Sequence, residues 1–388
     1  MNDRREALDT MDGGREFMGK RQVTILCSGF GLGFYIPGLL AASVFKERDI
    51  ATEVLVFESY LEQDKRDHIA DSRTAYHNNF ALANFSARMP MDIRSSMDYA
   101  QVELLLEVWA AEERCEFISL SGHWVYILDL YREKMLPSPI HVDLLYVDSD
   151  LAPSWKSLKK FHPRYDEHYY NACLYDTGKM AIRYEIPVLP GAPLPFESRK
   201  RRLVVHGGGW GMGTYQSTIP ELAAHNYGLD IVAYDWKEAK PDPGHRYWMN
   251  DPEWCSWVKS GSGLHEFPPY IEIAGEATNS YAAEADHHWL FDVASEAMAI
   301  VAKPGAGTLI DSLASETPLI LLEPFGSHEL SNLELWESLG FGIRYEKWRE
   351  MDFSVDVLKE MHQAIKDRPG ERTNYVDHYC SRVALMKR

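Results

Sequence analysis

The chain has 388 residues, a length that suits two domains of about 150–200 residues each. Its 58 acidic residues outnumber its 40 Lys and Arg and give a net charge of -18, which argues against a nucleic-acid-binding protein and disfavours an anionic membrane surface. The five cysteines form no CxxC pair and no apolar run is long enough to span a bilayer, so we expect a reduced, cytoplasmic protein without stable membrane insertion.

The first half of the chain alternates strand-like apolar runs with helix-like periods. Residues 1–21 mix acids and bases around a Gly-Gly pair and are expected to form a flexible leader. A buried strand at 23–27 leads through a glycine loop at 28–33 into a helix at 37–48. Further expected elements are strands at 53–57, 116–120 and 141–147 and helices at 98–112 and 124–133. This order predicts a Rossmann-like domain over 22–186, with a parallel sheet covered by helices on both faces.

Two stretches depart from this order. The segment 161–175 is dense in aromatic residues and histidines, and it is either an insertion that shapes an acceptor pocket or a helix that packs across the first domain. We favour packing. Residues 187–200 carry four prolines within nine positions, a composition that stiffens a linker and keeps it out of a sheet, so the domain boundary is placed there.

The second half repeats the same order of elements. A strand at 202–206 leads through a glycine loop at 207–213 into a helix at 216–226. The remaining expected elements are strands at 229–234, 298–303, 319–322 and 342–345 and helices at 305–315, 329–339, 354–366 and 372–386. The sequence therefore predicts an α/β fold with a second Rossmann-like domain over 201–370 and a cleft between the domains, where ligands bind at the carboxyl ends of the strands.

A glycine loop follows the first strand of each half. The loop 207–213 has five glycines, more than a tight turn requires, which favours contact of its backbone N–H groups with a phosphate or a closely approaching acceptor. The loop 29–33 matches the GxGxxG dinucleotide pattern only loosely, because Phe34 stands at its sixth position. Neither a nicotinamide nor a flavin cofactor is expected.

The stretch 301–332 carries the most specific signal. Lys303 ends an apolar strand, and Gly305 and Gly307 precede a helix whose free N–H groups and positive dipole end suit a diphosphate. Asp311 either forms a capping box with Thr308 or accepts hydrogen bonds from a ribose diol, and the two interpretations stand about even.

A second polar cluster, GSHELSN, follows strand 319–322. His328 and Glu329 begin a helix there, where the dipole favours a glutamate. Because this loop lies at the carboxyl end of the strand next to the Gly305 loop, both loops could instead face one ligand, with this one reaching its hydroxyls.

Three stretches resemble the GT-B glycosyltransferases, closest in type to the family of the lipid II-forming N-acetylglucosaminyltransferase within the UDP-glycosyltransferase superfamily. They are GFGLGFYIPGLLAASVF, LVVHGGGWGMGTYQSTIPELAA and AKPGAGTLIDSLASETPLILLEPFGSHELSN, in the expected order over about residues 22–345. The resemblance implies an acceptor-binding N-terminal domain, a C-terminal domain that binds the nucleotide sugar, and a last helix within 371–388 that crosses back.

The resemblance also assigns roles to single residues. It places Gly305, Ala306, Gly307, Thr308 and, from the other side, Gly208 and Gly209 against the diphosphate beside Lys303, and Asp311 on the ribose. His328, Glu329 and Asn332 stand where the family reaches the sugar, although Glu329 replaces the usual glutamine and cannot donate as an amide can. Gly31, Gly33 and Phe34 belong to the acceptor loop.

The general base is the main departure from the family pattern. Phe34 occupies the position that often holds a histidine, so we expect His123, after strand 116–120, to replace it, with Asp148 and Asp150 as the second option. The Asp148-Ser149-Asp150 spacing and the histidines of DHHW at 286–289 could suggest a metal, but a helix N-terminus and a lysine can neutralise a leaving diphosphate, so no metal is expected.

The expected function is transfer of a sugar from a UDP-sugar co-substrate to a small polar acceptor, for example in natural-product biosynthesis, with no other cofactor. Two alternatives stay open: a non-catalytic sugar-nucleotide binder or partner subunit, and a nucleotide-sugar epimerase on the same fold. A homodimer is also left open.

Overall fold

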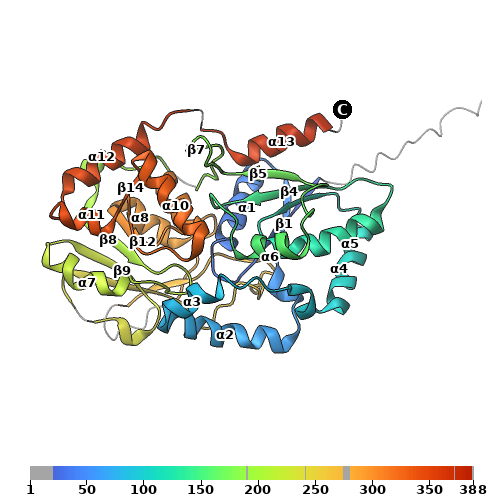
Figure 1. Ribbon diagram of the computed structural model, residues 1–388, viewed down its shortest axis with the longest axis horizontal. Helices are drawn as coiled ribbons and strands as arrows, with labels where there is room; N and C mark the ends of the chain where they lie inside the picture. Colours follow the sequence, from blue (N-terminus) through green and yellow to red (C-terminus); the bar gives the residue numbers. More distant parts are fainter. Residues whose placement is uncertain (1–20, 189–190, 241, 274–279, 371, 387–388) are drawn as a thin grey trace, which may run out of the picture.

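The computed structural model describes residues 21–188, 191–240, 242–273, 280–370 and 372–386, so the expected leader lies outside the described residues except for Arg21. Two sheets, one in each half of the chain, lie side by side, and each is built mainly of parallel strands (Figure 1). This arrangement confirms the predicted α/β class with two Rossmann-like domains.

The N-terminal sheet is parallel throughout. Its strands are β1 (Gln22–Cys27), β2 (Ala51–Val56), β3 (Glu116–Ser119), β4 (His141–Tyr146) and β5 (Tyr170–Cys173) in the order β2-β1-β3-β4-β5. Its helices are α1 (Tyr35–Glu47), α2 (Gln63–Asn78), α3 (Phe80–Ser86), α4 (Tyr99–Ala111), α5 (Val125–Met135) and α6 (Pro153–Phe161), with 3-10 turns η1 (Phe57–Tyr60), η2 (Ile93–Ser96) and η3 (Gly122–Trp124). Ile25 packs toward α1 and Leu26 toward α4 and α5, so both faces of the sheet are buried and its strands read as unbroken apolar runs.

The C-terminal sheet has the order β11-β10-β9-β8-β12-β13-β14, and only the edge strand β11 runs antiparallel. The strands are β8 (Lys200–His206), β9 (Gly228–Ala233), β10 (His245–Asn250), β11 (Tyr270–Glu272), β12 (Ala297–Ala302), β13 (Leu319–Leu321) and β14 (Gly342–Arg344). The helices are α7 (Tyr215–Ala224), α8 (Trp289–Glu296), α9 (Ala306–Ser315), α10 (Gly326–Leu339), α11 (Tyr345–Glu350), α12 (Val355–Lys366) and α13 (Tyr375–Met386), with 3-10 turns η4 (Phe196–Ser198) and η5 (Trp236–Glu238).

The aromatic segment 161–175 differs from both interpretations given to it. It contains the edge strand β5 and turns, followed by the start of a small antiparallel pair, β6 (Tyr175–Asp176) with β7 (Ala181–Ile182). Tyr165 and Tyr169 are buried, so the segment packs as favoured, but as a strand and turns instead of a helix. Strand β5 pairs with β4 at the edge of the sheet, and the spacing of apolar side chains in the segment does not predict this pairing.

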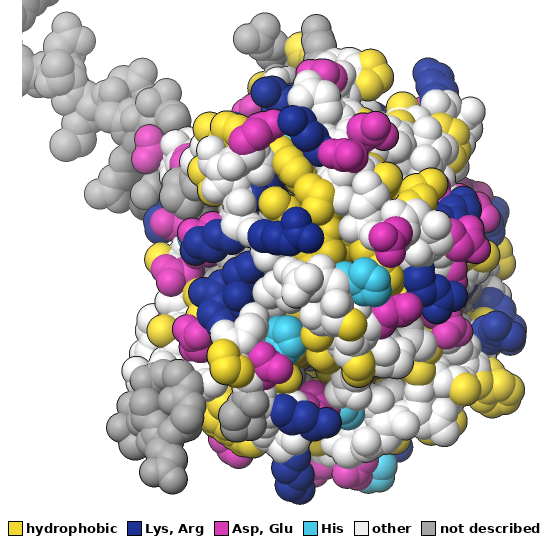
Figure 2. Space-filling model, turned by 90° about the vertical axis from the view of Figure 1, so that its left-hand side faces the viewer, with side chains coloured by type: hydrophobic (Ala, Val, Ile, Leu, Met, Phe, Trp, Pro, Cys, Tyr) yellow, Lys and Arg dark blue, Asp and Glu magenta, His cyan; other side chains and the backbone are white. Residues whose placement is uncertain are grey.

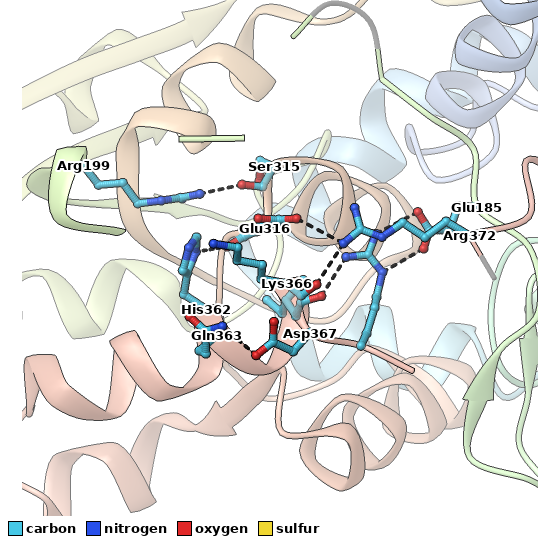
Figure 3. A network of polar contacts seen from close by, with 11 residues as sticks. Glu185, Arg199, Ser315, Glu316, His362, Gln363, Lys366, Asp367 and Arg372 are labelled. Carbon is cyan, nitrogen blue, oxygen red and sulfur yellow. Dashed lines mark hydrogen bonds and ion pairs between the residues drawn. The ribbon is translucent and has the colours of Figure 1, made fainter. Parts of the chain in front are cut away.

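The chain passes between the domains twice. The first passage is the proline-rich linker, and the second follows α12 and ends in α13, which lies over the N-terminal domain in Figure 1. The two passages are joined where the Arg368 guanidinium binds both carboxylate oxygens of Glu185 at 2.8 and 2.9 Å. Figure 3 shows the surrounding network, in which Arg199 donates to the Ser315 carbonyl and Arg372 lies 3.5 Å from Glu316.

Two further segments join the domains. From the N-terminal domain, α2 and α3 reach the other domain: both ring nitrogens of His77 are bonded, one to the Gly211 carbonyl at 2.7 Å and the other to Glu238 at 2.8 Å. From the C-terminal domain, the segment 254–268 returns the contact, since Tyr35 donates to the Glu266 carbonyl at 2.7 Å. Contacts from both domains therefore supplement the two passages of the chain in holding the domains together.

The surface shows no segregation of charge on the face drawn in Figure 2, where Lys and Arg lie interspersed with Asp and Glu. Within the described ranges, no helix has both the length and the apolar character needed to cross a membrane.

Candidate active site

One cavity of about 520 Å³ lies between the two domains. Its walls come from loops that follow strands of both sheets, as expected for ligand sites in parallel α/β folds. Most residues that the sequence proposed for the site line it: Gly31, Gly33, Phe34, His123, Asp148, Gly208, Gly209, Lys303, Gly305, Ala306, Gly307, Thr308, Asp311, His328 and Glu329. Asn332 and Asp150, which the sequence also proposed, are not among the residues that line it. The structure thus brings residues from five separate stretches to one space.

Glu58 fixes the N-terminal glycine loop through hydrogen bonds. The sequence did not single out this residue as part of the site. Its carboxylate accepts from the Ser28 hydroxyl and the Gly29 amide, both at 2.7 Å, and from the Phe30 amide at 3.1 Å. Burial raises the pKa of Glu58, and these hydrogen bonds oppose that rise. An acid at the end of the second strand was the available signal for this role.

His123 lines the cavity without an orienting partner. No described residue hydrogen-bonds its buried Nδ1, and its ring packs 5.0 Å from that of Phe57. Burial lowers the pKa of His123 to about 4, so the imidazole is neutral at pH 7 but a weak proton acceptor. These surroundings do not favour it as a general base.

Asp148 is better positioned. The side-chain amide of Asn332 donates to its Oδ1 at 2.8 Å. Burial raises the pKa of Asp148, while the nearby His328 opposes the rise. A carboxylate that is fixed in place and binds its proton more tightly than usual is a stronger base than an exposed aspartate.

The C-terminal glycine loop has structural reasons for its glycines. Gly208, Gly211 and Gly213 adopt φ values of +72°, +58° and +113°, which L side chains rarely adopt. A Cβ on Gly209 would lie 2.4 Å from Cγ of Leu32 in the opposite domain, so this loop meets the N-terminal loop directly. The glycine count alone is therefore explained by conformation and close packing, and it is the loop's place on the cavity wall that keeps it a candidate for ligand contact.

Lys303 stands between the two loops of the C-terminal domain. Its ammonium lies 3.6 Å from the point where a Cβ on Gly208 would stand and 3.9 Å from the same point on Gly305. It is bonded to Oε1 of Glu329 at 2.8 Å, and Oε2 of Glu329 accepts from the Phe325 amide at 2.7 Å, ahead of α10. Both oxygens of Glu329 are thus engaged by the protein itself.

Helix α9 presents its N-terminus to the cavity. Gly305 is the N-cap, no side chain caps the first turn, and Ala306, Gly307 and Thr308 line the space. Asp311 does not form the capping box with Thr308; its Oδ1 accepts from Nε2 of His288 at 2.9 Å. That alternative is therefore wrong, and the first-turn N–H groups are not occupied by a side chain of this helix.

A second buried histidine was missed by the sequence. His206 is the last residue of β8. Its Nδ1 accepts a hydrogen bond from the Gly208 amide at 3.0 Å, so the ring proton is on Nε2. Burial first, with the charge of Lys303, lowers the pKa of His206 to about 3, so the ring stays neutral and fixes the glycine loop. In the sequence, this role is indicated only by the histidine that directly precedes the glycine loop 207–213.

The residues considered as metal ligands point to separate partners. Asp148 is bonded to Asn332, whereas Asp150 lies 3.2 Å from Nζ of Lys156 and accepts from Ser327. In the described part of the chain, no group of three or more His, Cys, Asp or Glu is arranged to hold a metal ion.

Comparison with known proteins identifies the architecture. The glycosyltransferase SnogD from Streptomyces nogalater superposes with a TM-score of 0.52 and 14% identity, over 94% of this chain and 99% of its own. MurG from Acinetobacter baumannii superposes with a TM-score of 0.50 and 11% identity, also over 94% and 99%. The chain has the GT-B fold.

The GT-B assignment rests on structure, because no protein-family model and no curated protein matches the sequence. In this GT-B chain the cavity wall from the N-terminal domain combines a group of apolar side chains with polar and charged ones, among them Lys65, His68 and Asp92. Its apolar members include Phe30, Leu32, Phe34, Phe57, Leu61, Ile69, Met89, Met91 and Ile93. The wall from the C-terminal domain includes the charged or titratable residues His206, His288, Lys303, Asp311, His328 and Glu329.

Proposed function

We propose that this protein transfers a sugar from a nucleoside diphosphate sugar, with UDP as the expected nucleotide, to a hydroxyl-bearing acceptor. The observation that carries the proposal is the convergence of the uncapped N-terminus of α9 with Lys303 and Gly208 on one wall of the interdomain cavity. Backbone donors at a helix N-terminus and a buried ammonium are the groups that bind a diphosphate and stabilise its charge as it leaves. No metal is required in this proposal.

The acceptor would occupy the wall of the N-terminal domain, with Asp148 as general base. Asp148 takes the proton of the acceptor hydroxyl, the acceptor oxygen bonds to the anomeric carbon, and the bond from that carbon to the diphosphate breaks with its electron pair. We rank Asp148 above His123 because it is oriented by Asn332 and its pKa is raised, whereas burial lowers that of His123.

The apolar side chains that the N-terminal domain contributes to the cavity also indicate the chemistry of the acceptor. An acceptor with an apolar body and a hydroxyl at its reacting end would bury surface against Phe30, Phe57 and Met89. This chemistry is less polar than the small polar acceptor that the sequence suggested, and it is compatible with natural-product biosynthesis.

An epimerase is less well supported by the cavity. Such an enzyme needs a second carboxylate beside Asp148 as acid or base, whereas Glu58 and Glu329 have both carboxylate oxygens engaged by protein groups. A non-catalytic binder would use the same donor wall and is separated from a transferase by turnover alone.

Incubation with UDP-sugars tests the proposal. We expect UDP to bind by calorimetry and UDP-sugar to be slowly hydrolysed, with faster UDP release when an apolar alcohol is supplied. Conversion of the donor to its epimer would instead identify an epimerase, and a thermal shift without turnover would identify a binder. Failure of any nucleotide or nucleotide sugar to bind would overturn the proposal.

A matched pair of variants tests the donor wall. Lys303→Met together with Glu329→Gln removes the ammonium without leaving a buried carboxylate unpaired, and it should weaken UDP binding by about tenfold or more. Glu329→Gln alone keeps the ammonium and should leave UDP affinity within a few fold. Equal affinity in all three proteins would show that Lys303 does not contact the diphosphate.

A further inference from the structure

Asn332 uses the whole hydrogen-bonding capacity of its side chain. Its Nδ2 donates to Oδ1 of Asp148 at 2.8 Å and to the Pro304 carbonyl at 2.9 Å. Its Oδ1 accepts from the amide and from the hydroxyl of Ser149, both at 2.8 Å. The side chain is fully buried on α10, and an amide offers two donor hydrogens and two acceptor lone pairs, so nothing remains for a ligand.

The partners of Asn332 belong to two different parts of the proposed site. Asp148 and Ser149 follow β4 in the N-terminal domain, and Pro304 lies in the loop that leads into α9 in the C-terminal domain. One amide therefore fixes the general base relative to the loop that faces the diphosphate. A contact with a sugar hydroxyl, which the family resemblance implied for this position, would require one of these bonds to break.

We propose that Asn332 is a positioning residue that couples Asp148 to the donor loop across the domain interface, and that it does not bind the sugar. The proposal rests on the proposed function for its catalytic consequence. A general base works only within hydrogen-bond reach of the proton it takes, so a shift of Asp148 relative to α9 slows the reaction with little change in binding of the nucleotide. The Nδ2 donor also stabilises the ionised form of Asp148.

Two variants remove the donor in different ways. Asn332→Leu keeps the volume and removes every bond, whereas Asn332→Asp keeps an acceptor for Ser149 but cannot donate and places a second carboxylate beside Asp148. Both should lower kcat for UDP-sugar hydrolysis by about tenfold or more, leave UDP affinity within about threefold, and move the acidic limb of the pH–rate profile upward. A residue that bound the sugar would change KM for the sugar nucleotide instead.

Asn84→Ala is the matched control. Asn84 on α3 also joins the domains, because its Oδ1 accepts the Gly326 amide at 3.0 Å, but it contacts neither Asp148 nor the donor loop. It should weaken the interface without moving the acidic limb. If the limb moves equally in Asn84→Ala and in Asn332→Leu, a general loss of domain contact explains the effect and the positioning role is wrong.

Hydrogen exchange supplies a readout that does not depend on turnover. In both Asn332 variants, amide protection should fall together at 145–149 and at 303–308, whereas Asn84→Ala should leave both segments protected. Coupled loss in a protein that hydrolyses no nucleotide sugar would sustain the structural tie and reject the proposed function. Unchanged protection in a folded Asn332→Asp protein would overturn the tie itself.

Discussion

Two pairs of buried polar side chains that line the cavity are bonded to each other. Lys303 binds Glu329, and His288 binds Asp311, each pair with both members buried. Each bond satisfies buried polar atoms that would be costly to leave unpaired, and both pairs line the cavity in which a diphosphate would lie. The side chains of both pairs are therefore held in place before any ligand binds.

Asp148 exposes a conflict between stability and activity. Because burial raises its pKa in the folded protein, the folded state binds this proton more tightly than the unfolded chain does. The free energy of unfolding therefore falls as pH rises from the pKa of the unfolded chain through that of the folded one, and the cost of the carboxylate is fully present above the folded pKa.

We therefore expect Asp148→Asn to raise stability at pH 7–8 while it lowers turnover by about a hundredfold or more. The amide keeps an acceptor for Asn332, so the tie between the domains is retained. Urea unfolding at pH 8 and at about pH 4 measures the first effect, which should shrink at the lower pH because protonation of Asp148 in the folded protein relieves the cost of the buried carboxylate. A variant that is less stable at pH 8 would contradict this account.

These pairings could not be predicted from the sequence, although their members could. The glycine loops and the polar clusters predicted which residues face the cavity, because strand ends in a parallel sheet share one edge. The partners lie far apart in the chain, 184 residues for Asp148 and Asn332, and are set by how the two domains meet. Local sequence patterns do not indicate how the two domains pack against each other.

Among the helices, amphipathic character alone did not decide which were predicted, because the amphipathic helices α6 and α8 were missed. Helices such as α12 were predicted to within a residue or two, whereas α2 was missed. Only Ile69 is buried on α2, so this helix lacks the apolar stripe on which a prediction depends. It is stabilised instead by polar contacts with the other domain, such as those of His77.

The meeting of the two glycine loops can be tested directly. Gly209→Ala places a Cβ against Leu32 and should cost about 1–3 kcal/mol of unfolding free energy, because the two loops must separate. Leu32→Ala in the same protein makes room and should recover most of that loss beyond its own effect. Denaturant unfolding of the two single variants and the double variant measures the coupling, and simple additivity would show that the contact does not constrain the domains.

The molecule as a whole depends on the return of α13 to the first domain. Arg382 of α13 binds Asp143, a fully buried acid on β4, and Tyr375 donates to the same carboxylate at 3.0 Å. Burial raises the pKa of Asp143 to about 6, and the positive charge of the nearby Arg382 opposes this rise.

Arg382→Leu should destabilise the protein by about 3–5 kcal/mol at pH 8, where Asp143 would be left as an unpaired buried carboxylate. The loss should be smaller at pH 5, because without Arg382 the pKa of Asp143 rises further and the acid is then neutral in the folded state. Arg382→Leu with Asp143→Asn should remove this pH dependence. Equal losses at both pH values in the single variant would show that the pair is not ionic.

The last contact has a consequence for the order in which the protein can be made. Asp143 leaves the ribosome 239 residues before Arg382, and Glu116 leaves it 263 residues before its partner Tyr379. During synthesis Asp143 on β4 therefore emerges well before Arg382 and Tyr375, whereas Glu116 can already bind Arg21, which lies upstream of it. We therefore expect the N-terminal domain to gain stability when α13 docks on it, after the second domain has emerged.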